Sequence, residues 1–285
     1  MDYTPYPRNE KMYAGAERKF GITIEGVDFI VKFQTETAFD KRNNHISEYL
    51  GSHIFDLLGV KAQETHLGTY DGKQVVVCRD FNQSQHQFVP FNDVGESSIE
   101  EDRDQFQYSY DDIMAILRAN TKLTNVSETV DTFWDIYIID ALLGNFDRHG
   151  SNWGFLKYDN RYTLAPVFDN GSCLYPRLVQ EDLMNAVMES AEETNRRIFQ
   201  FPTSQIQLDG QKSSYFEIIN SLAFKECNEA LIRVYSRISI PSINRLINET
   251  PYLSETQRFF YKYIIRERYF KIIQASYKKL MGGKS

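Results

Sequence analysis

Residues 1–90 alternate short apolar runs with turn residues, a pattern typical of strands joined by tight turns. Strands are predicted over Phe20–Ile24 and Val27–Phe33, which form a hairpin around a glycine. Two further strands are predicted over Ala62–Tyr70 and Gln74–Phe81, joined by an Asp-Gly pair that favours two-residue hairpin turns. This part of the chain is therefore expected to be rich in antiparallel sheet.

One segment between the two hairpins has helical periodicity. From Asn44 to Leu58 the apolar residues recur at intervals of three and four, and Gly59 ends the pattern. A polar stretch, Thr35–Asn44, leads into it. The segment is predicted to be an amphipathic helix that begins near Asn44.

Helical periodicity dominates beyond Asp111. The run DTFWDIYIIDALLG, residues 131–144, is apolar on most faces and predicts a central buried helix that ends at its glycine. From Glu181 to Leu280 the chain is predicted to be mostly helix, with breaks at Pro241 and Pro251. The second part of the chain is therefore expected to be α-helical.

An acidic and polar segment, Asn92–Tyr110, separates the two regions. Its composition predicts a solvated, mobile connection, with a docking element for a basic partner as the alternative. The predicted domains are a β-rich N-lobe over 1–90 and an α-helical C-lobe over 91–285. The predicted fold class is α+β, with two lobes arranged as in protein kinases.

Composition and charge exclude several classes of protein. The chain is 42% hydrophobic and 14% aromatic, enough to bury a core, and its formal charge of −7 disfavours direct binding to nucleic acid. No apolar run is long enough to cross a bilayer, and the N-terminal residues lack the apolar core of a signal peptide. A cytoplasmic location without membrane binding is expected, and export by a route that needs no signal peptide stays open. Three scattered cysteines suggest neither a disulfide framework nor a zinc site.

The candidate chemistry follows the predicted buried helix. Asp147 and Asn152 stand five residues apart in a polar loop, a predicted hairpin comes next, and Asp169 begins an Asp-Asn-Gly sequence. Phosphoryl transfer needs a carboxylate to orient the incoming hydroxyl and oxygen ligands to hold Mg²⁺, and protein kinases use the same Asp-to-Asn spacing. Each residue alone would be an ordinary turn residue, and His149 an ordinary loop histidine. Their order together predicts a phosphotransfer site.

The N-lobe is expected to hold the other half of an ATP site. Lys32 stands in the apolar strand sequence FIVKF, where a lysine requires an ion-pair partner or solvent. Glu48, early in the next helix, is the predicted partner, and a surface glutamate is the alternative. The AGAERK segment, 14–19, could wrap phosphates through backbone N–H groups, although it matches no standard glycine-rich motif.

The sequences LLGNFDRHGSNWGFL and LAPVFDNGSCLYP resemble the signature of HipA-like serine/threonine kinases, and AGAERK resembles that family's phosphate loop. The resemblance runs from about Ala14 to beyond Pro251 and is greatest for the short CtkA-like members. It implies a HipA- and phosphoinositide-kinase-like fold, and a kinase that uses ATP and Mg²⁺ to phosphorylate itself or a protein substrate.

The resemblance also implies roles for individual residues. Asp147 would be the catalytic base, Asn152 and Asp169 would hold Mg²⁺, Lys32 with its partner Glu48 would contact phosphates, and His149 would lie by the nucleotide. The loop that would cover the phosphates comprises Ala14, Gly15, Ala16, Glu17, Arg18 and Lys19. The backbone that would meet adenine comprises Cys78, Arg79 and Asp80.

Two features depart from the HipA pattern. The chain is not expected to contain the additional N-terminal subdomain of HipA toxins. Met12 stands where HipA has the serine that it phosphorylates, so autoinhibition by that route is not expected, and Tyr13, Ser47 or Ser84 could be modified instead. An antitoxin-like or inhibitory partner is expected by the same resemblance. A nucleotide-binding module without catalysis, and a kinase for small molecules, remain the alternatives.

Overall fold

The computed structural model describes residues 1–13, 18–82, 86–98, 109–120, 122–208 and 210–283. The chain divides into two compact units, each assembled from separate stretches of sequence. The first unit contains Met1–Phe81, Pro166–Ser190 and Ser239–Tyr263. The second unit contains Asn82–Ala165, Ala191–Ile238 and Ile264–Ser285.

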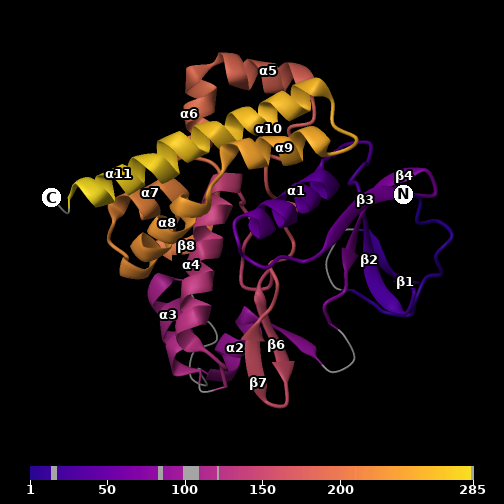
Figure 1. Ribbon diagram of the computed structural model, residues 1–285, viewed down its shortest axis with the longest axis horizontal. Coiled ribbons are helices and arrows are strands. Elements are labelled where there is room, and N and C mark those ends of the chain that lie inside the picture. Colours follow the sequence, from indigo (N-terminus) through magenta and orange to yellow (C-terminus); the bar gives the residue numbers. More distant parts are fainter. Residues whose placement is uncertain (14–17, 83–85, 99–108, 121, 209, 284–285) are drawn as a thin grey trace. The chain divides into compact units, whose positions relative to one another are not determined.

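A four-stranded antiparallel sheet forms the centre of the first unit (Figure 1). Its order is β1-β2-β4-β3, and its strands are β1 (Lys19–Ile24), β2 (Val27–Phe33), β3 (Thr65–Tyr70) and β4 (Lys73–Arg79). One face packs an apolar cluster that comprises Tyr3, Ile22, Val31, Phe33, Tyr70, Val75 and Val77. The helix α1 (Asn44–Leu57) packs against β3 and β4, and it also contacts α9 (Ile240–Glu249).

The predicted hairpins and helix of this unit are confirmed. Both predicted strand pairs are antiparallel neighbours, and the predicted helix begins at Asn44. The turn between β3 and β4 has positive φ at Asp71 (48°) and Gly72 (71°), the backbone that a two-residue hairpin turn requires. The unit also contains α5 (Glu181–Glu189).

The second unit is mainly helical, and α4 (Val126–Leu143) is its central element. Trp134, Ile138 and Leu142 are fully buried in it, and Gly144 ends the helix with a left-handed backbone, as the sequence predicted. The other helices are α2 (Phe91–Ser98), α3 (Tyr110–Ala119), α6 (Ala191–Phe199), α7 (Tyr215–Ser221), α8 (Lys225–Arg237), the π-helical η1 (Tyr269–Gln274) and α11 (Ala275–Gly282). The helix α10 (Glu255–Arg268) belongs partly to each unit.

Two small sheets occur in this second unit, and of their strands the sequence predicted only the hairpin that follows Asn152, which is confirmed. β5 (Gln87–Pro90) pairs with β6 (Gly154–Tyr158), which pairs with β7 (Arg161–Leu164), and β8 (Thr203–Leu208) pairs with β9 (Gln211–Ser214). The region from Glu181 to Leu280 is mostly helical, as predicted, but the paired strands β8 and β9 within it were not predicted.

The acidic connection also differs from expectation at its start. Residues Phe91–Ser98 are helical, with Phe91 and Val94 buried, whereas the whole segment Asn92–Tyr110 was expected to be a solvated linker. Residues 99–108 lie outside the described residues. Within the described part of the chain, no helix is both long enough and apolar enough to cross a bilayer.

Candidate active site

Lys32 points from β2 toward two carboxylates of the first unit. Its Nζ lies 3.3 Å from Glu48 Oε1 and 3.2 Å from Asp169 Oδ1. The Lys32 and Glu48 side chains are 9% and 2% exposed, so their charges must neutralise each other locally. Burial raises the pKa of Glu48, while the Lys32 ammonium opposes this shift. The partner that the sequence predicted for the strand lysine is therefore the one that the structure shows.

Asp169 is the most exposed member of this cluster. Its side chain is 40% exposed, and its backbone has a left-handed φ of 56°, which aspartate tolerates better than most residues. One carboxylate oxygen meets Lys32, and the exposed part of the group faces solvent, where it can accept a metal ion.

The Asp-Asn-Gly sequence is fixed against α1 by close packing. Asn170 is fully buried and donates a hydrogen bond of 3.0 Å to Ser52 Oγ. A Cβ on Gly51 would lie 2.6 Å from the Asn170 Cβ, so only glycine allows this approach. A Cβ on Gly171 would lie 3.4 Å from Glu48 Oε2. The second distance is an ordinary van der Waals contact, so it is Gly51 that allows the close approach of Asn170, the residue next to Asp169.

The backbone predicted to meet adenine is largely occupied within the fold. Arg79 N donates to Glu64 O at 2.9 Å, Asp80 N donates to Asp28 O at 2.9 Å, and Cys78 lies in the sheet between β2 and β3. An adenine bound through the N–H groups of Arg79 or Asp80 would have to replace these bonds. The predicted adenine contact stays a prediction.

Asp80 anchors the chain that leads into the predicted phosphate loop. Its carboxylate is almost fully buried and accepts from Lys11 Nζ at 2.9 Å and from Tyr13 Oη at 3.0 Å. Burial and this carboxylate together raise the pKa of Tyr13. The segment just before residue 14 is thereby tied to the end of β4.

The predicted phosphate loop is only partly described. Ala14, Gly15, Ala16 and Glu17 lie outside the described residues. Lys19 is the direct partner of Lys32 across β1 and β2, so both lysines lie on one face of the sheet. The Arg18 guanidinium instead lies 4.3 Å from the centre of the Phe33 ring. Because Phe33 follows Lys32 in the strand, it faces the other side of the sheet, and the structure does not bring Arg18 to Lys32.

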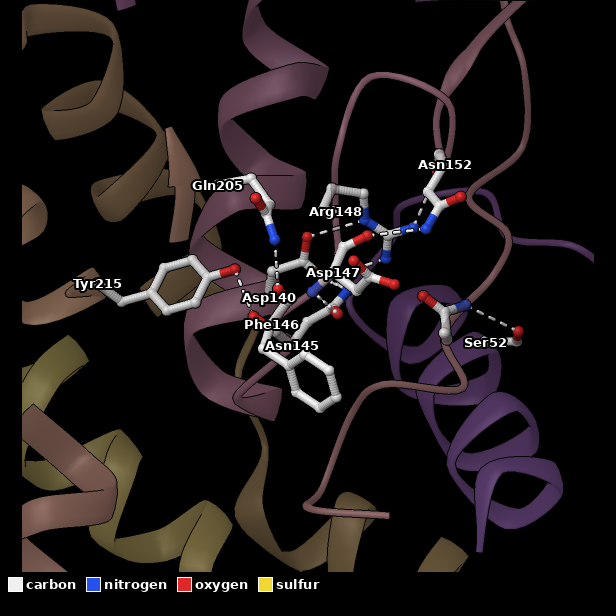
Figure 2. A network of polar contacts seen from close by, with 10 residues as sticks. Ser52, Asp140, Asn145, Phe146, Asp147, Arg148, Asn152, Gln205 and Tyr215 are labelled. Atoms are coloured by element: carbon white, nitrogen blue, oxygen red, sulfur yellow. Dashed lines mark hydrogen bonds and ion pairs between the residues drawn. The ribbon is translucent and has the colours of Figure 1, made fainter. Parts of the chain in front are cut away.

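The second unit carries Asp147 on a loop held by a buried ion pair (Figure 2). Arg148 donates to both carboxylate oxygens of Asp140, with Nε at 2.9 Å and Nη2 at 3.1 Å. The same carboxylate accepts from Asn145 Nδ2 at 2.8 Å. Asn145 Oδ1 in turn accepts from Asp147 N at 3.0 Å. The chain of contacts connects the end of α4 to the backbone of Asp147.

Two side chains from later in the sequence complete this support. Tyr215 Oη donates to the carbonyl of Asn145 at 2.7 Å, and Gln205 Nε2 donates to the carbonyl of Phe146 at 2.7 Å (Figure 2). Tyr215 is buried, which raises its pKa far above the usual range and keeps the phenol as a donor. The two residues before Asp147 are thus held through their carbonyl groups.

Asn152 and His149 shape the rest of the loop. Asn152 Nδ2 donates to the carbonyl of Asp147 at 2.8 Å, which leaves Oδ1 as the side-chain atom able to bind a metal. His149 Nε2 lies 3.8 Å from Asp147 Oδ1, and His149 Nδ1 accepts from Ser151 N at 3.2 Å. The Asp147 carboxylate is 44% exposed, so an acceptor hydroxyl can reach it.

The donor atoms fit Mg²⁺ rather than a transition metal. Asn152 supplies an amide oxygen and Asp169 a carboxylate, the oxygen ligands that Mg²⁺ prefers. Within the described residues, no group of three His, Cys, Asp or Glu side chains could hold a metal by itself. Asp169 belongs to the first unit and Asn152 to the second, so each is a candidate ligand considered by itself.

Sequence reasoning missed the residues that support the loop. Asp140, Asn145, Gln205 and Tyr215 were not among the predicted site residues, and neither was Arg148. One signal was present, because Asp140 is a carboxylate in the mostly apolar C-terminal half of α4, where a buried charge needs a partner. Gln205 and Tyr215 gave no such signal.

Comparison with known proteins decides the family. The model for the HipA-like C-terminal domain matches residues 12–231, well over half of the chain. The chain belongs to the HipA-like C-terminal domain family. It is 35% identical to the serine/threonine-protein kinase CtkA of Helicobacter pylori strain J99, over 98% of this chain and 88% of that protein.

Solved structures agree with this assignment. The crystal structure of the Helicobacter pylori proinflammatory kinase CtkA matches with a TM-score of 0.92 and 34% identity, over 99% of this chain and 98% of that one. The Shewanella oneidensis HipA, solved with HipB and operator DNA, matches with a TM-score of 0.60 and 16% identity, over 97% of this chain and 66% of that one. The second likeness shows the fold alone. Together the comparisons confirm the predicted family and fold class, and they support serine/threonine protein kinase activity.

Proposed function

We propose that this HipA-like kinase uses ATP and Mg²⁺ to phosphorylate serine or threonine hydroxyls of a protein substrate and of itself. The observation that carries the proposal is the buried Lys32, whose ammonium meets Glu48 at 3.3 Å and Asp169 at 3.2 Å. A lysine in a strand, a glutamate in the following helix and a metal-binding aspartate are the three parts that kinases use to hold ATP phosphates. The 35% identity to a serine/threonine-protein kinase supports the same activity.

Each residue then has a definite task. Asp147 orients the acceptor hydroxyl and receives its proton as the oxygen attacks the γ-phosphorus. The bond between the γ-phosphorus and the β–γ bridging oxygen breaks, and ADP leaves with that oxygen. Lys32 neutralises phosphate charge, and Glu48 keeps its ammonium in place.

Asn152 and Asp169 would hold Mg²⁺ in this scheme. When bound, the ion neutralises charge on the phosphate oxygens. The buried pair of Arg148 and Asp140 keeps Asp147 and Asn152 in one rigid loop, because Arg148 Nη1 also donates to the carbonyl of Asn152 at 3.1 Å. Positioning of this kind is the main contribution of a protein to phosphoryl transfer.

We also propose that a partner protein binds this kinase and inhibits it, as an antitoxin would. The related Shewanella oneidensis HipA was solved as a toxin–antitoxin complex with HipB and operator DNA. For the present chain the partner is a prediction, which co-purification from the native host can test.

Identification of the phosphorylated acceptor tests the proposed function. The chain is incubated with γ-labelled ATP and Mg²⁺ beside a mixture of protein, lipid, sugar and aminoglycoside acceptors, and phosphosites are mapped by mass spectrometry. We expect phosphoserine or phosphothreonine in protein. If the labelled phosphate appeared only in a lipid, sugar or aminoglycoside, the protein would be a small-molecule kinase instead. Thermal stabilisation by ATP with Mg²⁺ but no transfer would assign a nucleotide-binding module.

A further inference from the structure

A basic hollow opens on the first unit, and of its lining residues only Arg18 belongs to the predicted phosphate loop. It has a volume of about 730 Å³ and lies among the end of β2, the segment Thr35–Arg42 and the turn between β3 and β4. The charged residues that line it are the cations Arg18, Lys41, Arg42 and Lys73 and the carboxylate Glu36. Four positive side chains and one negative side chain thus line the hollow, and Asp40, which pairs with Arg42, adds a second negative charge beside it.

The segment Thr35–Arg42, here called the tongue, is an ordered part of the fold. Its two ends meet where Arg42 N donates to Thr35 O at 2.9 Å, and its tip closes where Thr37 N donates to Asp40 O at 2.8 Å. Thr35 N also donates to Asn44 Oδ1 at 2.8 Å, which ties the tongue to the start of α1. The backbone that carries Lys41 and Arg42 is therefore fixed before any ligand binds.

The ion pairs around the hollow are weak and exchangeable. Lys41 Nζ lies 2.9 Å from Glu36 Oε1, with side chains 51% and 61% exposed, and Arg42 pairs with Asp40. Exposed pairs of this kind contribute only about 0–1 kcal/mol, so an incoming carboxylate can displace them. Lys73, at the start of β4, is also exposed and lines the hollow. The positive excess stands out in a chain whose net charge is −7.

A large apolar side chain stands at the tip of the tongue. Phe39 is fully exposed, with a relative exposure of 101%. Beside the cations it offers a surface that a peptide with both acidic and apolar side chains can cover, whereas an inorganic anion would leave it in water.

We propose that the tongue and the hollow form a docking site for an acidic segment of a partner protein, which places carboxylates against Lys41 and Lys73 and an apolar side chain against Phe39. The site binds the partner separately from the residues that transfer phosphate. We choose an acidic occupant because its carboxylates would complement the positive charge of the hollow. The volume of the hollow is large enough to hold a few side chains of such a segment. Nucleic acid fits less well, because its long array of phosphates would meet the negative charge of the rest of the chain.

Fluorescence anisotropy of the full chain tests the proposal. The probe is a short fluorescein-labelled peptide in which glutamates alternate with leucines, and its control has lysine in place of glutamate. The test variant is Lys41→Gln with Lys73→Gln. The matched control is Lys122→Gln with Lys225→Gln, which removes the same charge from two exposed positions of the second unit. Neither pair includes a residue of the proposed catalytic site, so phosphorylation of a neutral acceptor should stay unchanged.

We expect the wild type to bind the acidic peptide and not the basic one, with an affinity that falls as salt rises. The test variant should bind about fivefold more weakly, from two exposed charge pairs, while the control variant binds like the wild type. Phe39→Ala should weaken binding about threefold or more. The proposal is overturned if the test variant binds the acidic peptide as tightly as the wild type does. It is also overturned if the control variant loses as much affinity for this peptide as the test variant. Preferential binding of duplex DNA or of phosphatidylserine vesicles through Lys41 and Lys73 overturns the assignment to a protein partner.

Discussion

Lys32 and Asp169 are 137 residues apart in the sequence, yet Lys32 Nζ donates to Asp169 Oδ1 across 3.2 Å. The lysine belongs to a strand, and the aspartate to the loop that follows β7. Glu48 completes the cluster from α1. A cation that two carboxylates share is positioned to exchange one of them for phosphate oxygens when ATP binds.

Replacing Lys32 with methionine should abolish most phosphotransfer and make stability depend on pH. Glu48 would lose the ammonium that opposes its raised pKa, so its carboxylate would stay protonated to a still higher pH. Its contribution to stability is then present below the unfolded-state pKa and is lost as the pH rises through the folded-state pKa.

Thermal unfolding at several pH values measures this effect. The variant should be less stable than the wild type by about 3 kcal/mol at about pH 8, and by much less at about pH 5. Lys61→Met, at an exposed position, is the control and should change neither property. If the variant lost the same amount of stability at both pH values, the unpaired Glu48 carboxylate would not be the cause of the loss.

Gly51→Ala should displace the Asp-Asn-Gly segment from α1. The new Cβ would stand 2.6 Å from the Asn170 Cβ, too close for two carbon atoms, so one of the two segments must move. We expect a loss of about 1–3 kcal/mol in the free energy of unfolding and a larger KM for ATP. Gly282→Ala, where nothing lies within 4 Å of the new Cβ, is the matched control in unfolding and kinetic assays. Wild-type kinetics in Gly51→Ala would show that the contact does not position Asp169.

Arg148→Met should destabilise the chain strongly, because it leaves the Asp140 carboxylate buried without its cation. Loss of a partner from a buried ion pair costs about 3–5 kcal/mol. Arg148→Lys keeps the charge but cannot bond both carboxylate oxygens, so an intermediate loss is expected. Urea unfolding of both variants checks the order. A midpoint for Arg148→Met equal to that of the wild type would contradict a supporting role for the pair.

Local elements were predictable because their signals are local. The hairpin turn at Asp71 and Gly72, the helix from Asn44 and the helix end at Gly144 each depend on residues within one or two turns. Lys32 was also informative, since a lysine in an apolar strand requires a partner, and Glu48 was the nearest carboxylate in the next helix.

Non-local pairings were not predictable in the same way. β5 and β8 are strands only because β6 and β9 lie beside them, and neither has a strong apolar alternation. Tyr215 reaches the carbonyl of Asn145 across 70 residues, and nothing in the sequence near either residue indicates that bond. The candidate catalytic residues were therefore visible in the sequence, while the buried contacts that hold their loop were not.

The proposed role of Asp147 is to orient the hydroxyl that receives phosphate, and the variant Asp147→Asn removes the carboxylate that would do so. The asparagine keeps the size of the side chain and leaves the backbone bond to Asn145 Oδ1 in place, so the loop should stay folded. Single-turnover phosphorylation with saturating ATP and Mg²⁺ measures the chemical step. We predict a rate about 10²–10⁴-fold below that of the wild type, with unchanged thermal stabilisation by ATP. A rate equal to that of the wild type would contradict the claim.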